Sequence, residues 1–408
     1  MPFAAGKRLV VIRTDVNNIA AIMKPGNYNA DNICPHGQAP GDVLPSTAAS
    51  GGINTDCLSS VWQMLNTTNA AAGGTSTLLD KKSAGDLANA RPGKAAPKWD
   101  SESIAAAVAL AKTAENLIVC ISNAGDEGGE GHDRASIALA DDQMQLATAV
   151  FAAVANKPGV RATLMMVDGG VIAFDGLKDV PPSILDIKMP GVYGAQAVAE
   201  TVFGRNVPAG KLPFTMYYSN YTEGCDIDDM SMQACNGRTY RYFAGPVIYP
   251  FGHGISGWSE ATFSLQWSPT PPPLAAAAAS VTFRGPADST TYKVVVKNTG
   301  SVYTADEVVL AFFKPKTSSL HGTDTPVVVK QLFGFERVRL APGATTTLSF
   351  AVNATTLSLV DSDGHTSLHA GQYDVVFSRG CVGCDELVAG IAVEAPQPIR
   401  LKTFRKWW

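Results

Sequence analysis

The sequence has no long hydrophobic run and no marked excess of charge of either sign. Its longest apolar stretch, Ile104–Ala111, is far shorter than the roughly 20 residues that a membrane-spanning helix needs. A formal net charge of −4 over 408 residues gives no reason to expect a basic surface for nucleic acid. Neither a membrane span nor a nucleic-acid partner is therefore predicted.

Several common catalytic signatures are also missing. There is no Gly-x-Ser-x-Gly segment of the kind that carries a serine nucleophile. The Gly-rich segment 122–134 is not followed by Gly-Lys-Ser/Thr, as a phosphate-binding loop would be, and its carboxylates would repel an anion. The six histidines are scattered without the spacing of metal ligands, so neither a metal nor another cofactor is expected.

Seven cysteines are present, and six of them form couples that are near in sequence. These couples are Cys34/Cys57, Cys225/Cys235 and Cys381/Cys384. They predict three disulfides, and the sequons at Asn66, Asn220 and Asn353 agree with export. Cys120 lies in an apolar run, where a buried thiol is the simplest interpretation.

The beginning of the chain does not fit export by itself. Met1–Arg8 lacks the pattern of a secretory signal, because its charges follow only a short apolar segment. An exported protein would therefore have further sequence upstream of Met1, whereas a cytosolic protein would keep its thiols unpaired. Cys381–Cys384 lies between late strands rather than at a helix start, so a redox motif is disfavoured.

The first half of the chain alternates predicted strands with predicted helices. The predicted strands are Leu9–Ile12, Leu117–Ile121, Arg161–Val167 and Ser183–Met189. The first predicted helix begins after a cap at Asp100 or Ser101, and the other two are Asp142–Ala155 and Gly194–Phe203. This alternation predicts βαβ units and a mostly parallel sheet with helices on both faces. Between the first predicted strand and the first predicted helix, Lys24–Lys98 shows almost no periodicity and is predicted to be a long irregular insertion.

After Gly257 the helical pattern disappears, and a Pro/Ala-rich stretch, Ser268–Ser280, is typical of a linker. The strands predicted after it are Tyr292–Asn298, Glu307–Lys314, Val327–Phe335, Thr345–Val352, Gln372–Ser378 and Glu386–Val393. Short strands at this spacing predict an all-β sandwich of the immunoglobulin or fibronectin type III kind. We therefore expect an α/β domain over 1–262, a linker and sandwich over 263–395, and a basic-aromatic tail over 396–408.

Ligands of open parallel sheets bind where loops leave the carboxyl ends of the strands. Three predicted loops do so here, and they begin at Ser122, Asp168 and Pro190. The loop over 122–134 combines four carboxylates, a histidine and an arginine with four glycines. One interpretation is a solvated acidic loop; the other is acid chemistry on a neutral substrate such as a sugar, since glycosidic cleavage uses a pair of carboxyl groups.

Several ordered segments resemble the second domain of family 3 glycoside hydrolases, of the plant and fungal β-xylosidase and β-glucosidase kind. These segments are Gly26-Asn27-Tyr28 with Cys34, Glu130-Gly131-His132-Asp133-Arg134, Gly194–Gly204, Asn206–Thr215, Gly237–Phe243 and Tyr249–Gly254. A fibronectin type III-like sandwich follows this αβα domain in the family, as it is predicted to do here. Together the segments are far more specific than any one of them alone.

The resemblance implies a retaining β-glycosidase acting on a carbohydrate, either a β-xyloside or a β-glucoside. It assigns the acid/base role to Glu130, with Glu127 as the reserve candidate because the spacing in this loop varies within the family. Asp133, Arg134 and Asp168 are expected to bind substrate or to orient the loop.

The sequence also departs from the family's pattern. Nothing in it resembles the family's N-terminal barrel, whose aspartate is the nucleophile, so we expect a barrel domain to act in cis upstream or in trans. The family's "SGGP" reads Asp168-Gly169-Gly170-Val171, and its "LPG" reads Leu139-Ala140-Asp141. Without a nucleophile, the chain alone is predicted to be inactive. The rival hypothesis is a non-catalytic carbohydrate-binding or structural module derived from the family.

Overall fold

The computed structural model describes ten stretches of the chain. They are residues 1–13, 61–80, 98–122, 134–188, 193–226, 228–254, 262–268, 281–316, 327–381 and 383–403. Contacts divide the chain into two compact units, of which the first is 1–206 with 217–222 and the second is 207–216 with 223–408. Each unit is described by itself.

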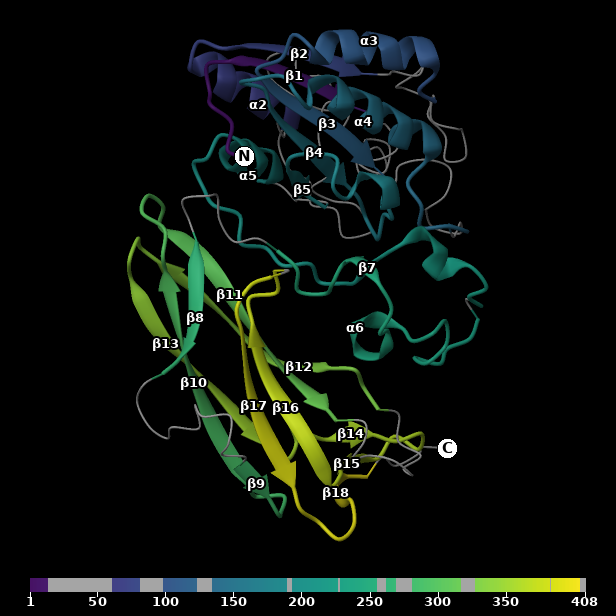
Figure 1. Cartoon of the computed structure of the whole chain (residues 1–408), viewed down its shortest axis with the longest axis vertical. Coiled ribbons are helices and arrows are strands. Elements are labelled where there is room, and N and C mark those ends of the chain that lie inside the picture. The colour runs from purple at the N-terminus through teal and green to yellow at the C-terminus, as the bar shows by residue number, and fades with distance from the viewer. Residues whose placement is uncertain are drawn as a thin grey trace, which may run out of the picture. The chain divides into compact units, whose positions relative to one another are not determined.

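The first unit is built on a five-stranded sheet in the order β2-β1-β3-β4-β5 (Figure 1). Its strands are β1 (Arg8–Arg13), β2 (Thr75–Asp80), β3 (Asn116–Ser122), β4 (Arg161–Val167) and β5 (Ile184–Asp186). Every neighbouring pair in the sheet is parallel. The inner strands β3 and β4 are apolar and buried almost throughout, as strands covered on both faces must be. The predicted αβα fold class is confirmed.

Helices cover both faces of this sheet (Figure 1). They are α2 (Val61–Ala71), α3 (Ser101–Ala111), α4 (Asp141–Val154) and α5 (Gly194–Val202), and η3 (Asp175–Leu177) and η4 (Ser219–Thr222) are short 3₁₀ turns. α2 and α5 pack together on one face, where Leu65 and Val198 join Leu9 and Ile118 in one apolar cluster. α3 and α4 contact each other, and Asp100 caps α3 by accepting a hydrogen bond from the Ser103 amide.

The irregular insertion predicted over Lys24–Lys98 is wrong for its middle part, because residues 61–80 form α2 and the edge strand β2. Asn69, fully buried on α2, explains how this polar segment is held. Its Nδ2 donates to the carbonyls of Lys7 and Thr75 at 2.8 and 3.0 Å, and its Oδ1 accepts from the Gly6 amide at 3.0 Å. Asn69 interrupts the apolar pattern of Val61 and Leu65 at its next helical position, so the pattern that indicates a helix is short.

Strand β5 is shorter than the predicted Ser183–Met189. It ends at Asp186, and Lys188 has a φ of 51°. A residue in the left-handed region cannot continue an extended strand, so the side chains beyond Asp186 leave the sheet.

The second unit is a sandwich of a three-stranded sheet, β13-β10-β8, and a five-stranded sheet, β12-β11-β16-β17-β9 (Figure 1). The strands are β8 (Phe263–Trp267), β9 (Val281–Phe283), β10 (Ser289–Asn298), β11 (Ala305–Pro315), β12 (Gln331–Leu340), β13 (Thr345–Asn353), β16 (Gly371–Ser378) and β17 (Glu386–Val393). A small sheet adds β14 (Leu359–Val360), β15 (Thr366–Leu368) and β18 (Ile399–Lys402), which lies within the predicted tail. The predicted fibronectin type III-like sandwich is confirmed.

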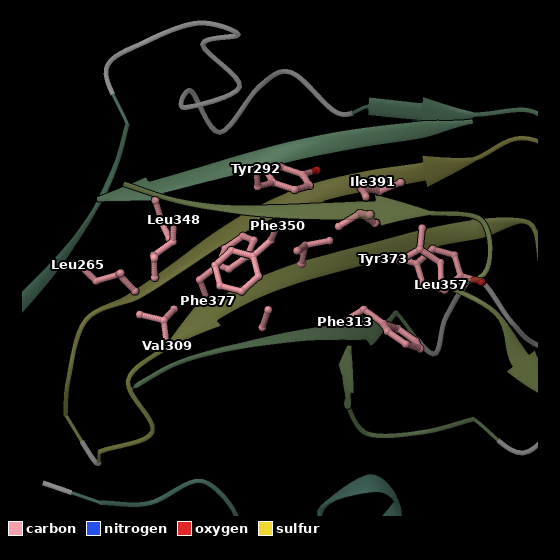
Figure 2. Packing of buried hydrophobic residues seen from close by; sticks show 14 of the residues in the cluster. Leu265, Tyr292, Val309, Phe313, Leu348, Phe350, Leu357, Tyr373, Phe377 and Ile391 are labelled. Carbon is pink, nitrogen blue, oxygen red and sulfur yellow. The ribbon is translucent and has the colours of Figure 1, made fainter. Parts of the chain in front are cut away.

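The core of the sandwich lies between its two main sheets (Figure 2). Phe350 of β13 and Phe377 of β16 lie with ring centroids 5.1 Å apart, and Tyr292 of β10 lies 5.7 Å from Phe377. These alternating inward-facing side chains come from both sheets, as two sheets packed face to face require.

Strand β12 occupies Gln331–Leu340, whereas the sequence predicted Val327–Phe335. β12 is an edge strand of its sheet, and its residues 335–337 are exposed. Arg337 and Arg339 on this strand both bind Asp306 of β11, at 2.6 and 3.1 Å. Charged side chains are common on edge strands, and they interrupt the alternation of apolar and polar residues from which a strand is predicted.

Two family-like segments pack on the outer face of β11. Beyond the sandwich, this unit contains α6 (Thr239–Tyr242) and β7 (Val247–Tyr249). The short strand β6 (Met216–Tyr217) pairs with β7, and the boundary between the units falls within it in sequence. Tyr240 and Phe251 stack at 4.1 Å, and both rings meet Phe312 of β11 edge-on, at 6.0 and 6.3 Å. The aromatic residues of these segments therefore serve packing.

Two of the three predicted disulfides are present, Cys225–Cys235 and Cys381–Cys384. The third, Cys34–Cys57, lies outside the described residues. Cys120 is buried in β3, as its apolar surroundings predict.

Candidate functional site

The candidate site is the carboxyl edge of the parallel sheet in the first unit. β3, β4 and β5 end there at Ser122, Val167 and Asp186, because parallel strands share one direction. Of the site residues expected from sequence, Arg134 and Asp168 are described. Glu127, Glu130 and Asp133 lie outside the described residues, as do Pro190 and Gly191, so their roles stay predictions.

The end of β3 is held by a buried glutamine from α4. The Ser122 amide donates to Gln143 Oε1 at 3.0 Å, and Gln143 Nε2 donates to the Ser122 carbonyl at 2.9 Å. This side-chain amide thus acts like one more strand residue, and it satisfies the backbone groups where β3 ends. The point at which the chain leaves β3 is fixed.

Arg134 is the last residue of the acidic Gly-rich segment in sequence, and it bonds to the segment after β4. Its Nε donates to the Ser136 carbonyl at 3.2 Å, and its Nη1 donates to the Val171 carbonyl at 3.1 Å. A parallel bridge between Ala138 and Ala173 continues this pairing. Arg134 therefore joins two segments at the sheet edge through their backbones.

Asp168 follows β4 directly and is fully buried. Its Oδ1 lies 2.8 Å from Lys188 Nζ, and the same ammonium lies 2.5 Å from Asp186 Oδ2. The Lys188 amide also donates to Asp186 Oδ1 at 3.1 Å. The carboxyl edge thus contains two carboxylates that share one ammonium, which we call the Asp168–Lys188–Asp186 cluster.

The electrostatics of this cluster follow from burial. Loss of water raises the pKa of the Asp168 carboxyl to about 6, and the negative charge of Asp186 acts in the same direction. The Lys188 ammonium and the Gly170 amide favour the carboxylate and limit the rise. A perturbed carboxyl group at the ligand-binding edge of an α/β sheet is a recognised mark of a functional site.

Sequence reasoning did not find Lys188 and Asp186 as members of the site. One signal was available: Asp186-Ile187-Lys188 occupies the carboxyl end of a predicted strand, where ligand-binding loops converge. The prediction of a strand through Met189 hid it, because alternating residues of a strand would be assigned to opposite faces.

This arrangement holds the ends of β4 and β5 together through one ammonium, and its buried carboxyl group has a pKa raised to about 6. Within the described stretches, no group of three or more His, Cys, Asp or Glu residues could hold a metal ion. No helix in those stretches is long and apolar enough to cross a membrane.

Comparisons with known proteins agree with this architecture. Residues 2–257 match the glycosyl hydrolase family 3 C-terminal domain, and residues 307–379 match a fibronectin type III-like domain. Beta-D-xylosidase 1 of Arabidopsis thaliana is 30% identical over 300 residues, which are 67% of this chain and 37% of that protein. Probable beta-D-xylosidase 6 of the same plant is 39% identical over 157 residues, or 37% of this chain and 19% of the relative.

Solved structures share the fold. A family 3 exo-β-xylosidase in complex with a xylobiose aziridine probe aligns over 100% of this chain and 47% of its own, with a TM-score of 0.72 and 19% identity. A β-glucosidase from Listeria innocua in complex with isofagomine aligns over 97% of this chain and 47% of its own, with a TM-score of 0.65 and 17% identity. The chain covers between 19% and 47% of the length of these relatives and solved structures. Because a family profile matches more than half of it, the chain belongs to glycosyl hydrolase family 3 and contains the family's C-terminal domain followed by a fibronectin type III-like domain.

Proposed function

We propose that the carboxyl edge of the parallel sheet forms the acid/base side of a retaining β-glycosidase site, with Glu130 as the acid/base and Glu127 as the reserve candidate. The observation that carries the proposal is the position of the two residues flanking this acidic segment. Ser122 is fixed at the end of β3 by Gln143, and Arg134 is bonded to Val171 beside the end of β4. An acidic segment that starts and returns at this edge is suited to present a carboxyl group to a sugar.

Retaining cleavage needs a second carboxyl group, the nucleophile, about 5–5.5 Å from the acid/base. We assign it to a barrel domain that acts either upstream in cis or in trans, in line with the family's other members. The substrate class is a β-xyloside or β-glucoside, which the names of the relatives support. Xylan breakdown would be the corresponding biological role.

The remaining site residues have supporting roles in this proposal. Arg134 orients the acidic segment through its hydrogen bonds to Ser136 and Val171, with Asp133 as its neighbour in sequence. Asp168 lies buried behind the edge, where it supports the surrounding loops rather than touching the sugar. We also propose an extracellular or cell-wall location, which the disulfides Cys225–Cys235 and Cys381–Cys384 support because such bonds persist in oxidising compartments.

The test combines the chain with the part of Beta-D-xylosidase 1 outside the region that this chain matches, where we expect the barrel domain. Neither part alone is expected to cleave an aryl β-xyloside, whereas the mixture or a fusion should do so. Glu130→Gln should lower turnover of a substrate with a poor leaving group by about 10²–10⁴-fold. Azide, which attacks without a general base, should restore turnover of an activated aryl xyloside and form a glycosyl azide.

Glu102→Gln, an exposed carboxylate at the start of α3, is the control and should keep full activity. Loss in Glu127→Gln rather than Glu130→Gln would transfer the acid/base role to Glu127. Turnover by the isolated chain that disappears in Glu130→Gln would place a nucleophile within this chain and refute the need for a barrel. Sugar binding without turnover in any combination would favour the non-catalytic carbohydrate-binding module.

A further inference from the structure

The Asp168–Lys188–Asp186 cluster contains more negative than positive charge. Two carboxylates, from the ends of β4 and β5, share the single ammonium of Lys188 at 2.8 and 2.5 Å. The exposed fractions of the side chains are 0% for Asp168, 15% for Asp186 and 30% for Lys188. An uncompensated charge is costly when buried, so the most buried carboxylate is the one that favours uptake of a proton.

The backbone of Lys188 indicates that its side chain has a definite role there. Its φ of 51° lies in the left-handed region, which a residue with a Cβ rarely adopts. Such a conformation persists only when surrounding contacts hold it in place. Here the contacts are the two ion pairs of the ammonium and the hydrogen bond from the Lys188 amide to Asp186.

Within the part of the chain that the structure describes, the charges that act on Asp168 come from one neighbouring segment. They are Asp186 and Lys188, both at the end of β5. On the other side of β4, the end of β3 contributes the neutral pair Ser122 and Gln143. The segment after 133 contributes Arg134, whose guanidinium is bonded to the carbonyls of Ser136 and Val171.

We propose that Lys188 is a positioning residue that fastens the end of β5 to the end of β4, and that protonation of Asp168 releases this hold. The cluster is thus a proton-dependent latch at the carboxyl edge of the sheet. The latch belongs to this chain's own residues and does not depend on the glycosidase proposal.

The pH range follows from the direction of the shift. The pKa of Asp168 is raised from its ordinary value of 3.8 to about 6, so the folded protein binds this proton more tightly than the unfolded chain does. The stability that protonation gives is fully present below pH 3.8 and is lost as pH rises to about 6. Above pH 6 Asp168 is charged and holds Lys188, and below it Lys188 keeps only the Asp186 carboxylate.

The first experiment measures thermal unfolding of the full chain and of Asp168→Asn between pH 4 and 8. The carboxamide has the same shape and cannot be charged, so it imitates the protonated state at every pH. The melting temperature of Asp168→Asn minus that of the natural sequence should rise from pH 4 to pH 6.5 and then stay constant. Asp374→Asn, in the more exposed Lys316–Asp374 pair, is the control and should show no such rise. A difference that is constant or falls with pH would overturn the proposal.

The second experiment measures hydrogen exchange of amides in peptides covering 164–170 and 184–188, corrected for the intrinsic effect of pH. In the natural sequence the amides of 184–188 should exchange about tenfold faster at pH 5 than at pH 7.5. The end of β5 opens locally while Asp168 stays buried, and a charge-assisted hydrogen bond no longer opposes that opening at pH 5. The buried amides of 164–170 report larger openings and serve as the internal reference. Asp168→Asn should exchange fast at both values. Lys188→Met should do the same, and Lys188→Arg should restore slow exchange at pH 7.5.

Exchange in this region that is independent of pH, or that is unchanged in Lys188→Met, would show that the cluster is an ordinary structural ion pair. Both experiments use the chain as it stands and need no turnover. A failed glycosidase assay therefore leaves their outcome unaffected, and a failed latch leaves the acid/base proposal unaffected.

Discussion

The ammonium of Lys211 lies 3.0 Å from Glu307 Oε1, and both side chains are buried. Lys211 comes from the Gly-Lys-Leu-Pro segment of the family-like motif, and Glu307 is the third residue of β11. Lys211 also donates to the Gly254 carbonyl at 2.7 Å, while Arg379 lies 3.4 Å from the other carboxylate oxygen of Glu307. The motif is thus tied to the sandwich by a buried charge network.

Replacing one partner of this pair should be strongly destabilising. Lys211→Met would remove the ammonium from the buried Glu307 carboxylate, which would keep the hydrogen bond from the Val308 amide and the longer contact to Arg379. We expect a loss of about 3 kcal/mol in the free energy of unfolding. Denaturant titration measures it. Lys316→Met removes the cation of the more exposed pair with Asp374 and should cost less than about 1 kcal/mol. Equal effects of the two substitutions would contradict the role given to burial.

Gly380 is at a position that no side chain can occupy. Its φ is 76°, and a Cβ there would collide with the Gly252 carbonyl oxygen, a backbone atom. Gly380→Ala should therefore cost about 1–2 kcal/mol for the left-handed conformation and about 1–3 kcal/mol more for the collision. Gly343→Ala is the matched control, because its φ is 74° and a Cβ would meet nothing within 4 Å. A melting temperature that falls equally in both variants would rule out the collision.

Asn69 should be essential for the segment that contains α2 and β2. Asn69→Ala would leave the Gly6 amide and the carbonyls of Lys7 and Thr75 without their partner, at a cost of about 3 kcal/mol. Asn66→Ala, at an exposed position on the same helix, should change stability by less than about 0.5 kcal/mol. Stability is measured by denaturant titration, with exchange of β2 amides as the local readout. A small effect of Asn69→Ala on β2 would refute this account of the segment.

The disulfide Cys225–Cys235 should be detected by mass spectrometry of unreduced protein from its native source. Because the bond closes a ring with a sequence separation of 10, the loop-entropy estimate of its stabilising effect is about 3 kcal/mol. The double substitution Cys225→Ser with Cys235→Ser should lower stability by up to that amount under oxidising conditions and by nothing after reduction. Complete alkylation of these thiols without reduction would argue against an exported protein.

The inner strands of the sheet could be read from sequence because their environment is uniform. β3 and β4 are covered on both faces, and continuous apolar runs meet that requirement. The segment containing α2 and β2 could not be read, since the polar Asn69 at its centre makes its hydrogen bonds to other elements. The boundaries of edge strand β12 were predicted wrongly for a related reason. Its exposed arginines form ion pairs with Asp306, so this part of the strand lacks the apolar alternation that indicates a strand.

For the candidate site, the sequence by itself determined which loops leave the carboxyl edge, and it therefore identified Asp168 and Arg134. It also determined the family, through the order of several short motifs. Only the tertiary structure decided which residues form ion pairs. Lys188, after β5, pairs with Asp168, after the neighbouring strand β4, and Lys211 pairs with Glu307, which is distant in sequence. The charge state of a carboxyl group depends on burial and on such neighbours, and neither is encoded in the residues that flank it.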